Sequence, residues 1–178
     1  MNKKIRWITE TAIILALLVT LQALTKPMGQ LVTGSCVNAL LAIAALVGGF
    51  SSGITVALIS PVLAFLLGIA PQILTVPAIM VGNTVYVVLL NLLVKEKKPQ
   101  WIMALLAAAL AKFGCLYLIV TKLICGILAP GLLASGTLKE PMLKALPATF
   151  STPQLVTALI GGAVAMAIVP VVKKALHK

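Results

Sequence analysis

The sequence consists of long apolar runs separated by short breaks that carry glycine, proline or lysine. A transmembrane helix needs about 20 mostly apolar residues, and Gly and Pro are the strongest local signals for an interruption. This pattern predicts six transmembrane helices, near residues 7–25, 31–47, 54–70, 74–94, 101–124 and 153–172.

The second to fourth of these spans lie in a stretch, residues 27–94, that contains no charged residue. That length leaves room for about three crossings. Gly-Gly-Phe-Ser-Ser-Gly at 48–53 separates the second span from the third, and Ala-Pro-Gln at 70–72 separates the third from the fourth. The second span is short, so we expect protein or a cavity to cover its ends at membrane depth.

A longer loop, residues 126–152, is predicted before the last span and contains several prolines. Its middle, residues 138–146, could form a short amphipathic helix that lies at the membrane interface.

Composition agrees with a membrane location. Hydrophobic residues make up 61% of the 178 and charged residues 10%, whereas soluble domains carry about 25% charge. The outer surface of this chain must therefore meet lipid.

The net charge of +11 is concentrated beside the apolar spans, which excludes a basic nucleic-acid-binding face. Nine of the 14 basic residues fall at the N-terminus, in one mid-chain turn and at the C-terminus. They are Lys3, Lys4, Arg6, Lys95, Lys97, Lys98, Lys173, Lys174 and Lys178. Basic clusters of this kind mark cytoplasmic edges and can contact anionic lipid headgroups.

Six crossings put both chain ends on one side of the membrane, and the basic mid-chain turn then falls on that side as well. We therefore predict an all-α membrane protein, a single domain over residues 1–178 that forms a bundle of six transmembrane helices with both termini cytoplasmic. The basic and apolar start of the chain has a poor cleavage pattern, so we interpret it as a retained first span rather than a signal peptide.

The inventory of catalytic groups is nearly empty, which disfavours an enzyme. The phosphate-binding Gly-x-x-x-x-Gly-Lys-Ser/Thr loop is absent, and the one histidine, His177, lies at the end of the chain. The three carboxylates, Glu10, Glu96 and Glu140, lie at a span end or in loops, so acid–base, metal and proton-coupling chemistry have little to use. The three cysteines lack metal or disulfide spacing. We predict no metal and no cofactor.

Lys112 is the most informative polar residue. It lies about 11 residues into the fifth span, roughly 16 Å from the inner end, where a lysine costs about 2.5 kcal/mol or more. Three explanations stay open: the amine is neutral, it reaches water in a cavity, or an anionic ligand is its partner. Snorkelling of the side chain is the structural alternative.

Several uncharged polar residues could share a binding site with Lys112. Asn38 and Asn83 lie inside spans, where interhelical hydrogen bonds are the alternative to ligand contact. Thr152 and Gln154 open the last span, where free N–H groups and the helix dipole favour an anion. Gln72 is a further candidate at the break between spans three and four. With the loops at 25–33 and 126–152, these residues could enclose one small, polar molecule.

Small residues recur at four-residue spacing, which lets helix backbones approach closely in lipid. The last span contains two such pairs, Ala158 with Gly162 and Gly161 with Ala165, for which ordinary packing is the simplest explanation. The pair Ala12 and Ala16 in the first span is the best candidate for contact with another subunit.

With these features the chain resembles the substrate-binding S component of energy-coupling factor (ECF) transporters, the vitamin-uptake branch of the ABC transporters. Ala12-Ile-Ile-Leu-Ala16 is similar to the family's Ala-x-x-x-Ala signature, and residues 38–53 are similar to its second span and tight turn. The resemblance also covers the size, the six spans, the basic termini and the long outer loop before the last span.

The resemblance implies a mechanism. An S component in the plasma membrane of a bacterium captures a vitamin or related micronutrient from outside, between the outer halves of spans four to six and the outer loops. It associates with a transmembrane coupling subunit through Ala12 and Ala16, and with two ATPases that bind the ATP. Toppling of the S component then releases the substrate inside. Neither the resemblance nor the residues name the vitamin, although Lys112 favours a carboxylate-bearing or otherwise anionic one.

Two other classes stay open. A self-sufficient secondary transporter would be expected to show internal repeats and intramembrane charges for ion coupling, and neither is clear here. A membrane scaffold subunit would use its polar residues only to link helices, and no ligand would copurify with it.

Overall fold

A computed structural model describes residues 2–69, 72–94 and 98–176, and every regular element in these ranges is helical. The long helices are α1 (Lys3–Thr25), α2 (Gln30–Val47), α3 (Phe50–Leu66), α4 (Thr75–Leu93), α5 (Lys98–Leu116) and α8 (Thr152–Ala175). The shorter ones are a 3₁₀ turn (Lys26–Met28), α6 (Ala129–Ala134) and α7 (Glu140–Thr149). A π-helical segment, Tyr117–Ile127, continues α5.

Five helical stretches are long and apolar enough to cross a membrane. They include α1 with its 3₁₀ turn, α2, α4, α5 with the π-helix, and α8. α3 is apolar but has 17 residues, and it falls at the short end of the lengths that span a bilayer. The all-helical fold is thus confirmed for the described residues, whereas the count of six crossings stays a prediction.

The segment before the last helix contains more structure than the sequence pattern indicates. The helix predicted within 138–146 is found as α7, but α6 was not predicted, and the helix that contains α5 runs to Ile127 rather than ending near residue 124. Its final part is π-helical, with wider i→i+5 turns that are rare in proteins and frequent near functional sites.

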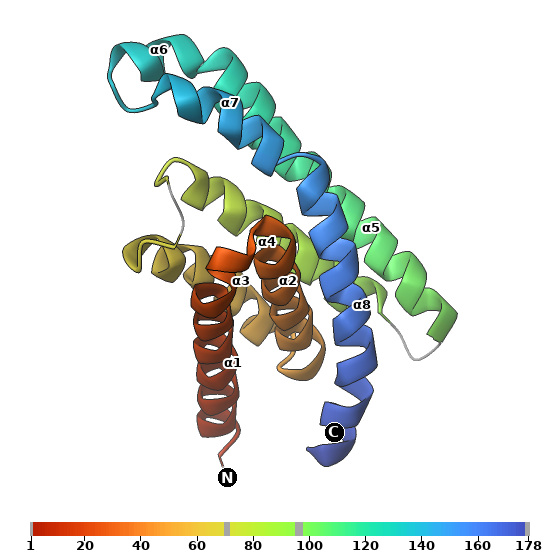
Figure 1. The fold of residues 1–178 in the computed structure, drawn as a ribbon. Helices are drawn as coiled ribbons and strands as arrows, with labels where there is room; N and C mark the ends of the chain where they lie inside the picture. Colours follow the sequence, from red (N-terminus) through yellow and green to blue (C-terminus); the bar gives the residue numbers. More distant parts are fainter. Residues whose placement is uncertain (1, 70–71, 95–97, 177–178) are drawn as a thin grey trace.

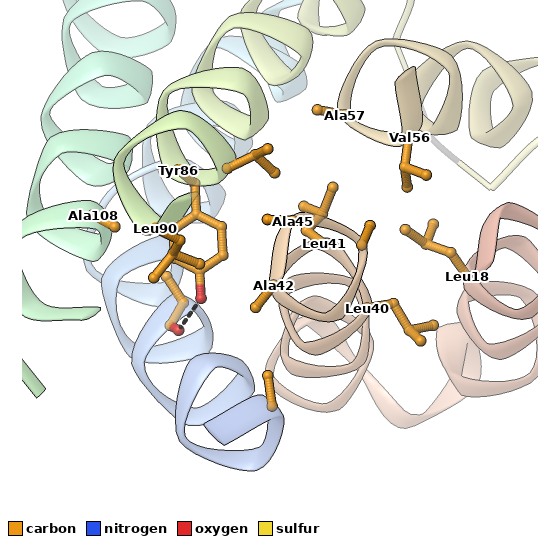
Figure 2. Packing of buried hydrophobic residues seen from close by; sticks show 14 of the residues in the cluster. Leu18, Leu40, Leu41, Ala42, Ala45, Val56, Ala57, Tyr86, Leu90 and Ala108 are labelled. Carbon is orange, nitrogen blue, oxygen red and sulfur yellow. Dashed lines mark hydrogen bonds between the residues drawn. The ribbon is translucent and has the colours of Figure 1, made fainter. Parts of the chain in front are cut away.

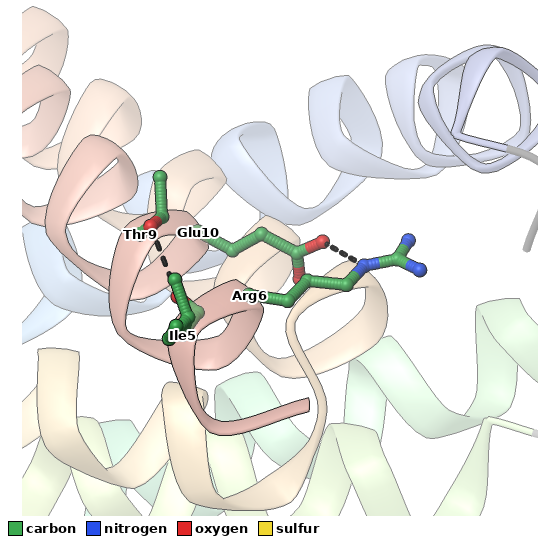
Figure 3. Close-up of polar contacts among 4 residues, drawn as sticks. All are labelled: Ile5, Arg6, Thr9 and Glu10. Carbon is green, nitrogen blue, oxygen red and sulfur yellow. Dashed lines mark hydrogen bonds and ion pairs between the residues drawn. The ribbon is translucent and has the colours of Figure 1, made fainter. Parts of the chain in front are cut away.

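The start of α1 and the end of α8 lie at one end of the bundle, and α6 and α7 lie at the other (Figure 1). At the start of α1, Arg6 Nε donates a 2.8 Å hydrogen bond to Glu10 Oε1 one turn along the helix (Figure 3). A partly exposed pair at this spacing contributes only a few tenths of a kcal/mol. The Glu10 carboxylate therefore pairs with Arg6 at the end of the bundle, far from its middle.

α2 is the central helix and packs most extensively against α8, with further contacts to α1, α3 and α4. The close approach to α8 depends on Gly161, because a Cβ there would lie 2.7 Å from the backbone nitrogen of Ala39. Gly162 on the same helix leaves room for Tyr86 and Leu105. The small residues of the last span therefore pack within the chain, as the simpler explanation predicted.

The hydrophobic core joins these helices. Fully buried side chains from four helices meet in it, namely Leu18, Leu41, Val56 and Tyr86 (Figure 2). The Tyr86 hydroxyl donates a 3.0 Å hydrogen bond to the backbone carbonyl of Ala158, so this phenol ties α4 to α8 while its ring fills the core.

Two sharp turns require glycine. Gly29, before α2, and Gly49, before α3, have φ values of +86° and +87°, a region that residues with a Cβ avoid. These turns set the angles between α1, α2 and α3, and the first of them places the start of α2 beside a cavity.

Candidate substrate cavity

A cavity of about 290 Å³ lies at the end of the bundle opposite the start of α1 and the end of α8. The end of α1 and the first halves of α2 and α4 form its walls, α5 contributes Lys112, α8 contributes Gln154, and α7 lies against it. Segments that are far apart in the sequence therefore share one polar space.

Lys112 lies at the buried end of this cavity and is 2% exposed. Its Nζ donates a 2.5 Å hydrogen bond to Asn38 Oδ1 on α2 and a 2.7 Å hydrogen bond to Asn83 Oδ1 on α4. The side chain does not snorkel to the surface. It joins three helices and still contacts the cavity.

A chain of hydrogen bonds fixes Lys112 as the donor. The backbone carbonyl of Gln154 can only accept, so the Thr157 hydroxyl donates to it, at 3.2 Å. The Thr157 oxygen then accepts from Asn38 Nδ2, also at 3.2 Å, which leaves Asn38 Oδ1 facing Lys112. Because an amide oxygen is an acceptor only, both Asn38 and Asn83 present an acceptor to the Lys112 amine.

Asn83 has one half of its amide unpaired. Its Oδ1 accepts from Lys112, but its Nδ2 is buried and has no hydrogen-bond partner among the described residues. An unpaired buried donor costs about 1–3 kcal/mol. Asn83 lines the cavity, so a bound molecule or water would remove that cost.

Tyr86 supports Lys112 from the core side. The Lys112 Nζ lies 5.4 Å from the centroid of the Tyr86 ring, within the range of a cation–π interaction. The negative face of the ring and the two amide oxygens thus surround the amine with favourable partners, none of which carries a full negative charge.

The rest of the cavity lining includes four glutamines and one exposed lysine. Gln22, Gln30, Gln72 and Gln154 lie there. Lys26 also lines it and donates a 2.6 Å hydrogen bond to the carbonyl of Gly68. The described lining residues include two ionisable side chains, and both are lysines, Lys26 and Lys112.

α7 covers the cavity and is held in place by a second hydrophobic cluster. Leu146 and Phe150 line the cavity and also pack with Leu116, Val120 and Leu138. Gln72 Nε2 reaches across to donate to the carbonyl of Thr137, at 3.2 Å. The segment between the π-helix and α8 therefore acts as the cover of the site.

The structure brings together five of the six residues that the sequence suggested for binding. Those five are Asn38, Gln72, Asn83, Lys112 and Gln154. Thr152 is exposed and does not line the cavity. It is the first residue of α8, two positions before Gln154. Whether the five contact a substrate stays a prediction.

Sequence reasoning missed several lining residues. Gln22 and Thr75 lie in apolar helices, and their polarity was the available signal. Phe150 and Met142 gave no signal, because apolar side chains are expected on any packed helix.

Ala12 and Ala16 lie elsewhere. Both are exposed on α1, next to the exposed side chains of Ile13 and Leu17. This small-residue face is unpartnered within the described chain, while the opposite face of α1 buries Ile14 and Leu18.

The described residues contain no group of three or more His, Cys, Asp or Glu side chains close enough to hold a metal ion. The three cysteines are free and partly buried.

Five membrane-length apolar helices around a cavity that contains a buried lysine are the architecture of a multi-pass membrane protein. The family model described as ECF transporter, substrate-specific component, matches residues 6–173. The chain therefore belongs to this family, and the resemblance inferred from its sequence is confirmed. Its role is that of a substrate-binding transporter component, which is not an enzyme class. Comparison with curated proteins and with solved structures gives no match.

Proposed function

We propose that this chain binds a vitamin or related micronutrient in the cavity beside Lys112, on the outer side of a bacterial plasma membrane, and delivers it to an ATP-driven coupling module. The observation that carries the proposal is the buried Lys112, which lines a polar cavity and has only amide oxygens and an aromatic ring as described partners. A purely structural lysine would be expected to reach the surface or to pair with a carboxylate.

The charge distribution supports this orientation. Lys3, Lys4 and Arg6 lie at the start of α1, and Lys173 and Lys174 at the end of α8, both at the end of the bundle away from the cavity. Positively charged segments favour the cytoplasmic side. The cavity would then face outward, both termini would be cytoplasmic, and α3 would be the sixth crossing.

The exposed face of α1 is the proposed docking surface for the transmembrane coupling subunit. Ala12 and Ala16 leave it shallow enough for a second helix to approach closely. Two ATPase subunits would bind and hydrolyse ATP in the assembled transporter, so the energy for uptake would not come from this chain.

Binding is tested by extracting the gently purified protein and identifying the released small molecules by mass spectrometry. We expect one micronutrient-sized molecule in near-stoichiometric amount, and its rebinding should saturate at one molecule per chain. Finding none, together with no binding from a panel of water-soluble vitamins, would favour a scaffold subunit.

Transport is tested in proteoliposomes. We expect ATP-dependent uptake only when the chain is reconstituted with its coupling subunit and ATPases. Uptake by this chain alone, driven by an ion gradient, would instead indicate a secondary transporter.

Topology is tested by labelling single cysteines in a variant in which Cys36, Cys115 and Cys125 are replaced by alanine. We expect Asn2→Cys and Lys174→Cys to react from the cytoplasmic side and Thr137→Cys from outside. Ends that react from opposite sides would contradict the six-span arrangement.

A further inference from the structure

We propose that the substrate carries a carboxylate, and that this group binds at the buried end of the cavity against Lys112 and Asn83. The inference rests on the proposed function, since it specifies the chemistry of the molecule that the cavity holds.

The first support is that the buried end of the cavity offers N–H donors that have no acceptor among the described residues. An ammonium has three N–H groups, and Lys112 uses two of them on Asn38 and Asn83. The Asn83 Nδ2 adds a buried donor that has no partner among the described residues. The amide oxygens of Asn38 and Asn83 each accept a hydrogen bond from Lys112. A ligand group with acceptor oxygens would satisfy the donors that are left open.

The second support is the missing counter-charge. Glu10 pairs with Arg6 at the start of α1, Glu140 is exposed at the start of α7, and Glu96, which lies outside the described residues, precedes α5 by two positions. No described carboxylate contacts Lys112. An uncompensated buried charge is costly. A ligand with a negative charge would therefore form the ion pair with Lys112 that the described residues do not provide.

The donor set fits a carboxylate better than a phosphate. The remaining N–H of Lys112 and the Nδ2 of Asn83 match the two oxygens of a monoanion. Lysine can also bind phosphate, but as a point charge, and phosphate sites commonly add bidentate arginine or several backbone N–H groups at a helix N-terminus. The sequence has one arginine, Arg6, which lies at the other end of the bundle.

The rest of the cavity indicates what the remainder of the molecule looks like. Its volume of about 290 Å³ is at the lower limit for ligand pockets, so the molecule is compact. Val37, Ile79 and Phe150 offer apolar contact, and the outer glutamines offer hydrogen bonds to polar groups at the far end. A small monocarboxylate with a polar tail meets all three conditions.

The test compares matched acid and neutral probes on the purified full chain by titration calorimetry. Suitable pairs are nicotinate with nicotinamide, pantothenate with pantothenol, and biotin with its primary amide, while thiamine, pyridoxine and pyridoxal phosphate extend the panel to cationic, neutral and phosphorylated molecules. We expect the best binder to be an acid, with an affinity at least about 10-fold above that of its neutral partner.

Variants locate the carboxylate. Lys112→Met should reduce the affinity for the acid at least about 10-fold and bring the ratio between acid and neutral probe close to one. Lys122→Met is the matched control, because Lys122 is exposed, stacks over Tyr117 at 5.5 Å and does not line the cavity. It should leave both affinities unchanged.

Asn83→Asp separates a binding role of the site from a structural one. It places a carboxylate of the chain itself beside Lys112, where the ligand carboxylate would bind. We expect it to reduce the affinity for the acid at least about 10-fold while the melting temperature stays at or above that of the parent chain. If Lys112 has only a structural role, the Asn83→Asp variant should bind acids in preference to neutral probes as strongly as the parent chain does.

The outcomes distinguish this inference from the proposed function. A neutral, cationic or phosphorylated molecule that binds best, or that is extracted from the purified chain, overturns the carboxylate and leaves the substrate-binding role intact. The carboxylate proposal is also overturned if an acid binds best but Lys112→Met and Asn83→Asp leave its affinity unchanged. Failure of every probe, with no molecule extracted, contradicts both.

Discussion

Asn38 Nδ2 on α2 lies 3.2 Å from Thr157 Oγ1 on α8, and this hydrogen bond decides which end of the Asn38 amide faces Lys112. The two residues are 119 positions apart in the sequence. Thr157 accepts from Asn38 because its own proton is donated to the Gln154 carbonyl. A neutral hydroxyl that does not itself line the cavity thus fixes the orientation of the Asn38 amide beside Lys112.

Replacing Thr157 by valine tests this relay. The change keeps the shape of the side chain but leaves Asn38 Nδ2 unpaired, so the amide loses its fixed orientation. We expect the substrate affinity to fall about 10-fold and the free energy of unfolding to fall by about 1 kcal/mol or more. Titration calorimetry and thermal unfolding in detergent measure the two quantities.

The control for that change is Thr84→Val. The Thr84 hydroxyl donates to the carbonyl of Met80 on its own helix and does not line the cavity. It should leave the affinity unaltered. An equal loss in both variants would mean that the Asn38–Thr157 bond has no specific role.

Gly161→Ala should separate α2 from α8. The added methyl group would lie 2.7 Å from the Ala39 nitrogen and from the Asn38 Cβ, distances that real Cβ atoms essentially never show. Overpacking of this kind costs about 1–3 kcal/mol, and a shift of α2 would also move Asn38 away from Lys112. We expect a lower melting temperature together with weaker substrate binding.

Gly114→Ala is the matched comparison, since a Cβ at Gly114 meets nothing within 4 Å. Alanine is a better helix former than glycine by up to about 1 kcal/mol, so this variant should be equally stable or more stable. If Gly161→Ala behaves the same way, the close approach of α2 and α8 is not required.

Phe150→Ala should loosen the cover of the cavity. Phe150 is 6% exposed and belongs both to the cavity lining and to the cluster that holds α7. Truncation of a buried phenylalanine costs about 3–5 kcal/mol, and here part of that cost falls on the closed arrangement of α7. We expect the substrate dissociation rate to rise at least about 10-fold, measured by stopped-flow release.

Phe113→Ala serves as its control, because Phe113 packs beside Tyr117 on α5, is partly exposed and does not line the cavity. Its substrate release should keep the parent rate. Equal acceleration in both variants would show that general destabilisation, and not the cover, controls release.

Ala12→Trp and Ala16→Trp should abolish assembly with the coupling module without affecting substrate binding. The indole rings would project from the exposed face of α1 and prevent close helix contact. Co-purification with a tagged coupling subunit measures assembly, and titration of the isolated chain measures binding.

Ala107→Trp, at an exposed position on α5, controls for the bulk of tryptophan in the bilayer. Assembly that survives in the Ala12 and Ala16 variants, or that fails equally in the Ala107 variant, would place the docking surface elsewhere.

The sequence by itself determined the fold class, because twenty-residue apolar runs cannot remain soluble and in lipid must satisfy their backbone groups as helices. It also indicated Lys112, since a charge in an apolar run is costly wherever the helix lies. The family followed from the same features, and the match over residues 6–173 confirmed it.

Only the tertiary structure decided which polar residues meet. Asn38, Asn83 and Lys112 lie on three helices, and nothing in the local pattern of any one helix sets its rotation against the others. This rotation depends on Gly161, which lets the backbones of α2 and α8 approach closely, and on the turn at Gly29, which has a positive φ. Thr152, two positions before Gln154 and equally polar, faces away for the same reason. Local energies fix which segments are helices, whereas the contacts between helices determine which of their faces enclose a site.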